Sequence, residues 1–244
     1  PAPSADITKP RFEVSWQRWR LDDETINAGR ANLGSELTIL RWSKQGAARC
    51  ELGLDAGVLA IFNLDGKTQD LLNADYVVGF PLSARRGPLS GRFRLYHQSS
   101  HLGDEFLLNP QPVPTVERIN LSFEALEALG SYEWKSLRGY LGATRILHSH
   151  TPLDRWRAQA GVDFRGRTLH WKTARIVAGL DLQWWEETDW DMDVSLKAGM
   201  MFRSPYSEAR SIQVLLEYYD GHTPHGQFYE LEVDYWGVGV AFAF

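Results

Sequence analysis

Apolar and polar residues alternate over long stretches of this chain. A period of two places successive side chains on opposite faces and therefore predicts β-strands. Glycine, proline, aspartate and asparagine separate the stretches, as expected for turns. The pattern predicts about twelve strands, at residues 11–20, 33–42, 50–62, 75–82, 89–100, 115–125, 134–147, 156–164, 171–184, 190–202, 211–219 and 228–244.

The predicted strands have two chemically different faces. One face is apolar with aromatic residues near its ends, and the other carries charges of both signs. Crossing a bilayer at a tilt takes about 9–11 residues, whereas strands of soluble domains are commonly about 5–6 residues long. We therefore predict an all-β fold, a single antiparallel transmembrane β-barrel of about 12 strands. It forms one domain over residues 1–244, with residues 1–10 as a periplasmic N-terminal segment. A soluble barrel or sandwich is the alternative.

Composition narrows the classes of function. The 244 residues carry a formal net charge of −5 without a basic stripe, which argues against nucleic-acid binding. The single cysteine, Cys50, excludes an internal disulfide and a cysteine-rich metal site. No apolar run approaches the roughly 18 residues of a membrane helix. The chain begins Pro1-Ala2-Pro3 without a signal peptide, so we expect a cytoplasmic protein or one whose signal peptide has been removed. The barrel pattern favours the second, with location in the bacterial outer membrane.

The last residues alternate into a terminal phenylalanine, with residues 238–244 reading Val-Gly-Val-Ala-Phe-Ala-Phe. This ending resembles the C-terminal recognition signal of bacterial outer-membrane barrels. The resemblance implies that the barrel assembly machinery recognises the last strand.

Loop lengths distinguish the two ends of the predicted barrel. Short turns are expected at the periplasmic end and longer loops at the external end. All histidines except His170 then fall at the external end, namely His97, His101, His148, His150, His222 and His225. The external rim is therefore predicted to carry a binding or catalytic site, although polar loops also gather histidines by chance.

Charged residues of both signs are predicted to line the lumen. They are Glu51, Asp55, Arg118, Glu124, Arg157, Asp163, Arg175, Asp181, Asp193, Lys197 and Glu217. Because the signs balance, we expect these side chains to pair across strands. A lumen of about twelve strands is narrower than the channels of porins with 16–18 strands. A plugged, salt-bridged lumen is expected rather than a wide pore.

One stretch combines an apolar face with candidate chemistry. Within residues 91–101 the odd positions begin with Phe93 and Leu95 and continue with His97 and Ser99. The last two side chains leave the same face of the strand, which is predicted to meet lipid. A hydroxyl becomes an effective nucleophile when a neighbouring base accepts its proton and a third group orients the base.

The next predicted strand supplies the third group. Its odd positions are apolar and are predicted to face lipid, and Glu117 lies on the same face at the external end. We predict Ser99 as the nucleophile, His97 as the general base and Glu117 as the orienting acid. An oxyanion would be stabilised by backbone N–H groups in residues 100–103, or by a cation held by Asp104 and Glu105.

A His-x-Ser pair on the outer face of a barrel strand, with an acid on the next strand, resembles outer-membrane phospholipase A and the lipid A deacylases. The resemblance covers His97, Ser99 and Glu117 and implies hydrolysis of acyl esters in the outer leaflet. The phospholipase pattern continues Ser-Asn-Gly, where this chain has Ser99-Ser100-His101. The calcium use of that family implies Asp104 and Glu105 as ligands. A homodimer is left open.

Residues 96–106, together with residues 118–122, are also similar to a bacterial family of uncharacterised outer-membrane proteins. That likeness supports the fold and names no activity. The candidate binding residues around the His-x-Ser pair are Ser100, His101, Gly103, Arg118 and Asn120.

Two functions from different classes follow. The first is an outer-membrane acyl-ester hydrolase of the phospholipase or lipid A deacylase type, acting on phospholipid or lipopolysaccharide. The alternative is a non-enzymatic outer-membrane barrel, structural, ligand-binding or a narrow channel, whose lumen is plugged and whose external histidines capture a ligand or metal.

Overall fold

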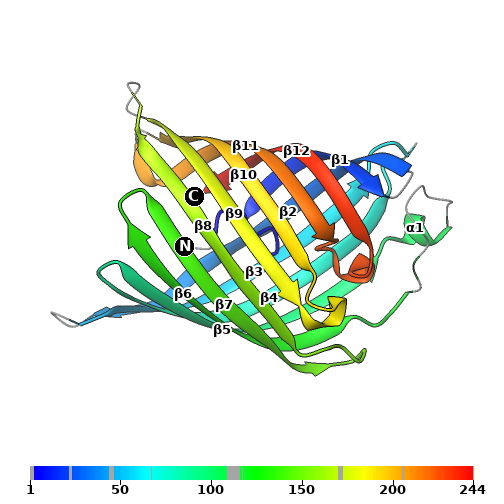
Figure 1. Ribbon diagram of the computed structural model, residues 1–244, viewed down its shortest axis with the longest axis horizontal. Helices are drawn as coiled ribbons and strands as arrows, with labels where there is room; N and C mark the ends of the chain where they lie inside the picture. The colour runs from blue at the N-terminus through cyan, green and yellow to red at the C-terminus, as the bar shows by residue number, and fades with distance from the viewer. Residues whose placement is uncertain are drawn as a thin grey trace.

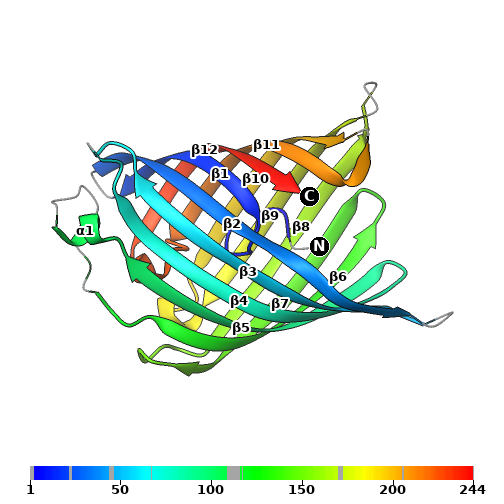
Figure 2. The same cartoon turned by 180° about the vertical axis from the view of Figure 1, so that it is seen from behind.

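Twelve strands of the described residues close into one antiparallel barrel, in which β1 pairs with β12 (Figures 1 and 2). The computed structural model describes residues 3–21, 24–43, 47–66, 68–108, 116, 118–169, 173–204 and 206–243. The elements are β1 Phe12–Leu21, β2 Glu24–Ser43, β3 Arg49–Asn63, β4 Leu71–Arg86, β5 Leu89–Leu102, α1 Asp104–Leu108, β6 Ser122–Trp134, β7 Leu137–Ser149, β8 Trp156–Thr168, β9 Ala174–Trp185, η1 Glu186–Thr188, β10 Met192–Ser204, β11 Ser207–His222, η2 Gly226–Phe228 and β12 Glu232–Ala243. The predicted fold class is confirmed.

The wall of the barrel is apolar outside and polar inside. On β5, Phe93 and Leu95 are 60% and 48% exposed, whereas Arg92 and Arg94, at the alternate positions, are 8% and 2% exposed. A period of two on a closed sheet produces this alternation between outer face and lumen. Among the described residues, no helix is long and apolar enough to span a membrane.

Ion pairs fill the lumen, as the balanced charges predicted. Glu13 of β1 contacts Arg30 and also Lys197, whose Nζ lies 2.6 Å from its Oε1. Lys197 also lies 3.1 Å from Glu217. Further pairs join Arg94 with Asp55 (2.6 Å), Arg92 with Glu127 (2.8 Å), and Arg138 with Asp163 (2.6 Å). Buried charges need such partners because water is excluded from them.

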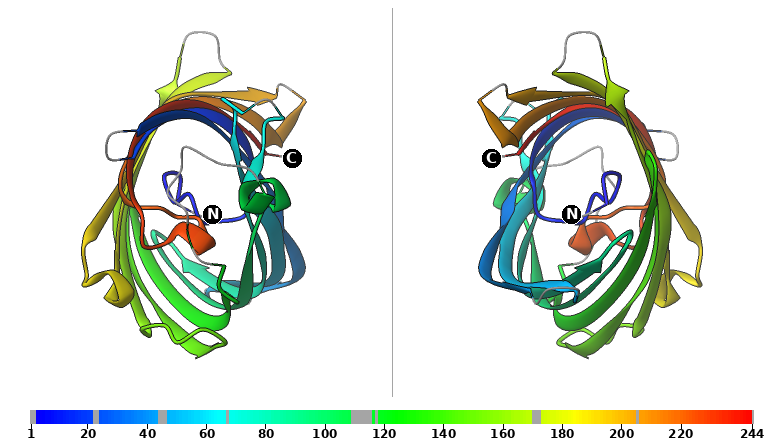
Figure 3. Two further views of the ribbon diagram at one scale, coloured as in Figure 1. Left: turned by 90° about the vertical axis from the view of Figure 1, so that its right-hand side faces the viewer. Right: turned by 90° about the vertical axis from the view of Figure 1, so that its left-hand side faces the viewer.

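The N-terminal segment lies inside the barrel, which corrects the prediction of a periplasmic segment ahead of it. Figure 3 shows this segment, in dark blue, coiled within the ring of strands. Ala5 and Asp6 are completely buried. The Ala5 carbonyl accepts a hydrogen bond from the Ser195 hydroxyl (2.8 Å), and Asp6 accepts one from the Gln159 amide (2.9 Å). Polar groups of the wall thus find partners on the segment, which occupies the lumen.

The loop of residues 223–231 closes the lumen at the end of the barrel near α1. The amide of Gln227, in η2, donates hydrogen bonds to the carbonyls of Ser100 (2.8 Å) and Ile119 (3.0 Å). The ring of Phe228 packs against Phe106 of α1, with ring centroids 5.2 Å apart. In Figure 1, α1 and this loop lie at the end of the barrel away from the C-terminus.

The predicted strand at residues 115–125 differs most from the structure. Strand β6 begins at Ser122, and its apolar residues near that end face the lumen, where Phe123 is 1% exposed and Leu121, just before the strand, is 2% exposed. They pack inward because the loop and Arg157 fill the external part of the lumen, and Arg157 lies 5.3 Å from the Phe123 ring. Glu124 therefore points outward, which corrects its predicted inward orientation.

Candidate active site

The outer face of β5 changes from apolar to polar toward its external end. Phe93 and Leu95 are followed on that face by His97 and Ser99, because side chains two residues apart share a face. Ser100, between Ser99 and the next outward residue, is 3% exposed and faces the lumen. The outward orientation predicted for His97 and Ser99 is thus the one that the strand adopts.

Glu124 supplies a carboxylate to His97. The two residues are directly paired between β5 and β6, and Nδ1 of His97 lies 2.9 Å from Oε1 of Glu124. Directly opposed residues of antiparallel strands have side chains on the same face. Ser99 is paired in the same way with Ser122. The outer wall thus carries a hydroxyl, an imidazole and a carboxylate on two neighbouring strands.

A second imidazole binds the other oxygen of this carboxylate. Nδ1 of His148 lies 3.0 Å from Oε2 of Glu124. His148 reaches the outer face because the register of β6 and β7 shifts: Glu124 pairs with His148 but Ala125 pairs with Ile146, which leaves Leu147 as the extra residue. Such a bulge reverses the face of the residues that follow it. The ring of His150 lies 5.4 Å from that of His148.

The hydrogen bond to Glu124 determines which nitrogen of His97 is free to act as a base. An ionised carboxylate only accepts hydrogen bonds, so Nδ1 carries the proton. The lone pair then lies on Nε2, and the ring orientation is held by Glu124. A base oriented in this way by an acid is the arrangement that activates a nearby hydroxyl.

Two of the backbone N–H groups predicted to stabilise an oxyanion donate hydrogen bonds to other backbone carbonyls. The N–H of Ser100 donates to the carbonyl of Leu121 (2.9 Å), and the N–H of Gly103 donates to the carbonyl of Leu72 (3.0 Å). The Ser100 hydroxyl donates to Oδ1 of Asn73 inside the barrel (2.9 Å). Ser100 and Gly103 therefore hold the strand end and its closing loop, which corrects their prediction as donors toward the outer face.

The other predicted residues are distributed along the external end. His101 is exposed beside the ring of Tyr76, at 5.7 Å between centroids. Arg118 and Asn120 are exposed in the segment before β6, where the Asn120 carbonyl accepts a hydrogen bond from the Thr151 hydroxyl (3.0 Å).

Glu117, predicted as the orienting acid, lies outside the described residues. Asp104 is exposed at the start of α1, and nothing is described of the Glu105 side chain. The calcium ligands therefore stay a prediction.

Two further histidines at this end are placed differently from each other. His225 is 2% exposed and stacks on Trp19, at 5.8 Å between centroids. Burial lowers the pKa of His225 to about 3, so this imidazole stays neutral. His222, at the end of β11, is partly exposed. His225 is thus part of the lumen plug, while His222 remains at the rim.

Fold and rim together define a barrel of the outer-membrane type, with imidazole, hydroxyl and carboxylate groups on its outer wall. The chain belongs to the family described as protein of unknown function DUF1207, whose model matches residues 7–244. No functionally curated protein matches it.

Solved structures confirm the architecture. Outer membrane phospholipase A from Escherichia coli superposes with a TM-score of 0.59 at 12% identity, covering 100% of this chain and 94% of that one. The Salmonella typhi outer membrane phospholipase, a dimer with bound calcium, gives a TM-score of 0.60 at 12% identity, covering 98% and 93%. The beta domain of the Bordetella autotransporter BrkA gives 0.50 at 14% identity, covering 97% and 99%. At these identities the likeness shows the fold, and it supports a location in an outer membrane.

Proposed function

We propose that this protein is an outer-membrane acyl-ester hydrolase with Ser99 as nucleophile, His97 as general base and Glu124 as the positioning acid. The observation that carries the proposal is the hydrogen bond between His97 and Glu124 on the outer wall, beside a serine on the same face of β5. Glu124 takes the role first expected for Glu117. The fold likeness to outer membrane phospholipase A agrees with this assignment.

The proposed reaction has two steps. Oγ of Ser99 attacks the ester carbonyl carbon while Nε2 of His97 takes the hydroxyl proton, and the alcohol leaves with that proton as its C–O bond breaks. A water molecule then attacks the acyl-enzyme, His97 takes a proton from the water and returns it to Ser99, and the fatty acid is released. Glu124 stabilises the imidazolium that forms in each step.

The substrate class follows from where the site lies. A shallow apolar groove on the outer wall is lined by Val58, Tyr76, Val78 and His97. An acyl chain of a membrane lipid can lie in this groove with its ester near Ser99, because Ser99 is directly paired with Tyr76. Phospholipid and lipid A both present such esters at the membrane surface.

Calcium takes part in neither step of the proposed reaction. Ca²⁺ takes about 6–8 oxygen ligands, and Asp104 contributes one exposed carboxylate beyond the end of β5. The Salmonella typhi relative binds calcium, so calcium dependence at Asp104 and Glu105 stays a prediction. Fatty-acid release measured with calcium and with a chelator tests it, as does the variant Asp104→Asn.

Fatty-acid release from mixed micelles of phospholipid or lipid A, by the purified barrel in detergent, tests the proposal. Ser99→Ala should abolish release and also labelling by a fluorophosphonate. Ser122→Ala is the matched control, because Ser122 lies directly opposite Ser99 on β6, and it should keep most of the activity. Equal loss in both variants, or release that survives Ser99→Ala, would contradict the assignment.

A non-enzymatic barrel is the second candidate, and the filled lumen favours it. Residues 3–10 and η2 both lie in the barrel interior, where Ile7 and Phe228 belong to one apolar cluster. Such a barrel would be structural or would bind a ligand at its rim rather than conduct ions. Absence of lipid hydrolysis and of fluorophosphonate labelling in folded protein would favour this candidate.

A further inference from the structure

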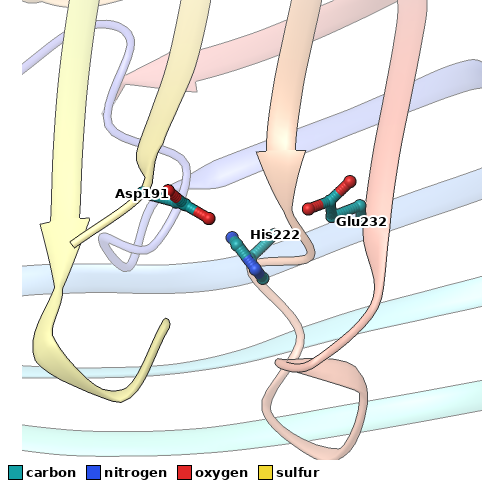
Figure 4. A group of neighbouring side chains, drawn as sticks. All are labelled: Asp191, His222 and Glu232. Carbon is teal, nitrogen blue, oxygen red and sulfur yellow. The ribbon is translucent and has the colours of Figure 1, made fainter. Parts of the chain in front are cut away.

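A second group of ligating side chains lies on the rim, away from β5 and β6. Asp191 precedes β10, His222 ends β11 and Glu232 begins β12. One ligand atom from each residue lies within 4.8 Å of the others. Figure 4 shows the His222 ring between the two carboxylates, which approach it from neighbouring strands. We propose that these three residues bind a first-row divalent metal cation. Zn²⁺ is the cation used to test binding.

The donor set fits such an ion. One imidazole and two carboxylates are typical ligands of Zn²⁺ and of other first-row divalent metals, whereas Ca²⁺ and Mg²⁺ prefer oxygen alone. Ligand atoms about 2.0–2.2 Å from a tetrahedral metal lie roughly 3.3–3.5 Å apart. Rotation of the exposed Asp191 and Glu232 side chains can close the remaining distance. Three protein ligands leave a fourth position open to water or to a lipid phosphate.

His222 is held in place by the strand beside it. The backbone N–H of His222 donates a hydrogen bond to Oδ1 of Asp193 (2.7 Å), and the same oxygen lies 3.4 Å from the ring Nδ1 of His222. Gly221 has a φ of +138°, and a Cβ there would come within 2.3 Å of that carboxylate oxygen. Glycine therefore permits the close approach that fixes His222. A carboxylate behind the imidazole is also the usual outer-shell partner of a metal-binding histidine.

An excess of negative charge favours a cation at this groove. The groove contains Asp191, Asp220, Glu232 and Asp234. Arg20 pairs with Asp234 (2.7 Å), which leaves an excess of negative charge around His222. A bound cation would offset the repulsion between the carboxylates.

Binding would link the ends of three strands around the loop of residues 223–231. Because the ligands come together only in the folded barrel, Zn²⁺ should raise its thermal unfolding temperature. The site lies on strands other than those of the proposed hydrolase, so it can be tested whether or not lipid is cleaved.

Calorimetric titration of the purified, detergent-folded protein with Zn²⁺ tests the proposal. Wild type should bind one equivalent, and His222→Gln or Glu232→Gln should weaken affinity by more than about tenfold. Co²⁺ should give a visible absorption band that His222→Gln removes. His148→Gln is the matched control, since it removes an imidazole from the other rim cluster, and it should leave this site unchanged.

Two results would overturn the proposal. One is no binding of Zn²⁺ or Co²⁺ to folded wild type. The other is equal affinity in wild type, His222→Gln and Glu232→Gln, with loss only in His148→Gln. Heat-modifiable migration on gels establishes that each variant is folded, and Glu232→Gln, at an exposed position, provides a second variant if His222→Gln fails that check.

Discussion

Glu124 binds one imidazole with each carboxylate oxygen, to His97 at 2.9 Å and His148 at 3.0 Å. In the proposed mechanism the first bond holds the proton on Nδ1 of His97, so that Nε2 faces the reaction. The second bond limits rotation of the carboxylate. The proposed chemistry thus depends on Glu124, which the alternation of its neighbours in the sequence predicted to face the lumen.

Replacing Glu124 tests this role. Glu124→Ala should lower kcat for ester hydrolysis by about 100-fold or more with little change in KM, since the base loses its orientation but the lipid groove remains. Glu124→Gln should retain part of the activity, because an amide oxygen still accepts from Nδ1. Kinetics on micellar substrate provide the measurement. The control is Glu117→Ala, which should keep kcat; a larger loss there than in Glu124→Ala would return the role to Glu117.

At the scale of elements, the bulge at Leu147 brings His148 to the outer wall. Without it, strict alternation from Ile146, which is 3% exposed, would turn His148 inward. The paired strands β5, β6 and β7 then present a single polar patch above an apolar band. A one-residue insertion therefore determines which groups meet at the candidate site.

Deleting Leu147 should return His148 to the lumen side. We expect a barrel that still folds and a loss of activity of roughly three- to tenfold, the value of about one ordinary hydrogen bond, because the pair is exposed to solvent. His148→Ala should cause a similar loss, because both changes free one oxygen of Glu124. Activity assays combined with gel migration of the folded form measure this. Full activity in both variants would show that His148 plays no part.

For the molecule as a whole, the lumen is a network of buried ion pairs rather than an open path. Glu13 contacts both Arg30 and Lys197, and all three side chains are almost fully buried. Removing one member of such a network leaves buried charge without a partner. The interior therefore contributes to stability while the outer wall carries the proposed chemistry.

Glu13→Ala should destabilise the barrel by about 3–5 kcal/mol, since two buried cations lose a partner. Glu51→Ala is the control, because its pair with Arg41 (2.7 Å) lies at the exposed end of the barrel, and it should change stability by about 0–1 kcal/mol. Denaturant unfolding in micelles measures both. Equal effects would argue against a network that stabilises the interior.

Removal of residues 1–10 together with the loop of residues 223–231 should open the lumen. Planar bilayers should show no steady conductance with the whole protein and small conductance steps with the shortened one, because the segment and the loop fill the space between the strands. A conducting whole protein would contradict the plug and support the narrow-channel alternative.

The barrel and the His-x-Ser face follow from local pattern. Alternation along residues 89–100 is a property of neighbours in the chain, so it predicted the strand and the outward direction of His97 and Ser99. The same rule placed the apolar Leu121 and Phe123 outside, and there it was wrong. The apolar partners of Phe123 include Tyr96 and Trp185 of other strands and Tyr229 of a loop more than one hundred residues away, and local pattern carries no information about such contacts.

By itself, then, the sequence determined a twelve-stranded closed sheet, its balanced lumen charges and the side of β5 that faces outward, because these depend on the period of the pattern and on the number of repeats. Tertiary structure alone decided that Glu124 bonds His97, that His148 bonds the same carboxylate, and that the N-terminal segment lies within the barrel. Register, bulges and the course of a plug depend on contacts between distant segments, and these form only when the sheet closes.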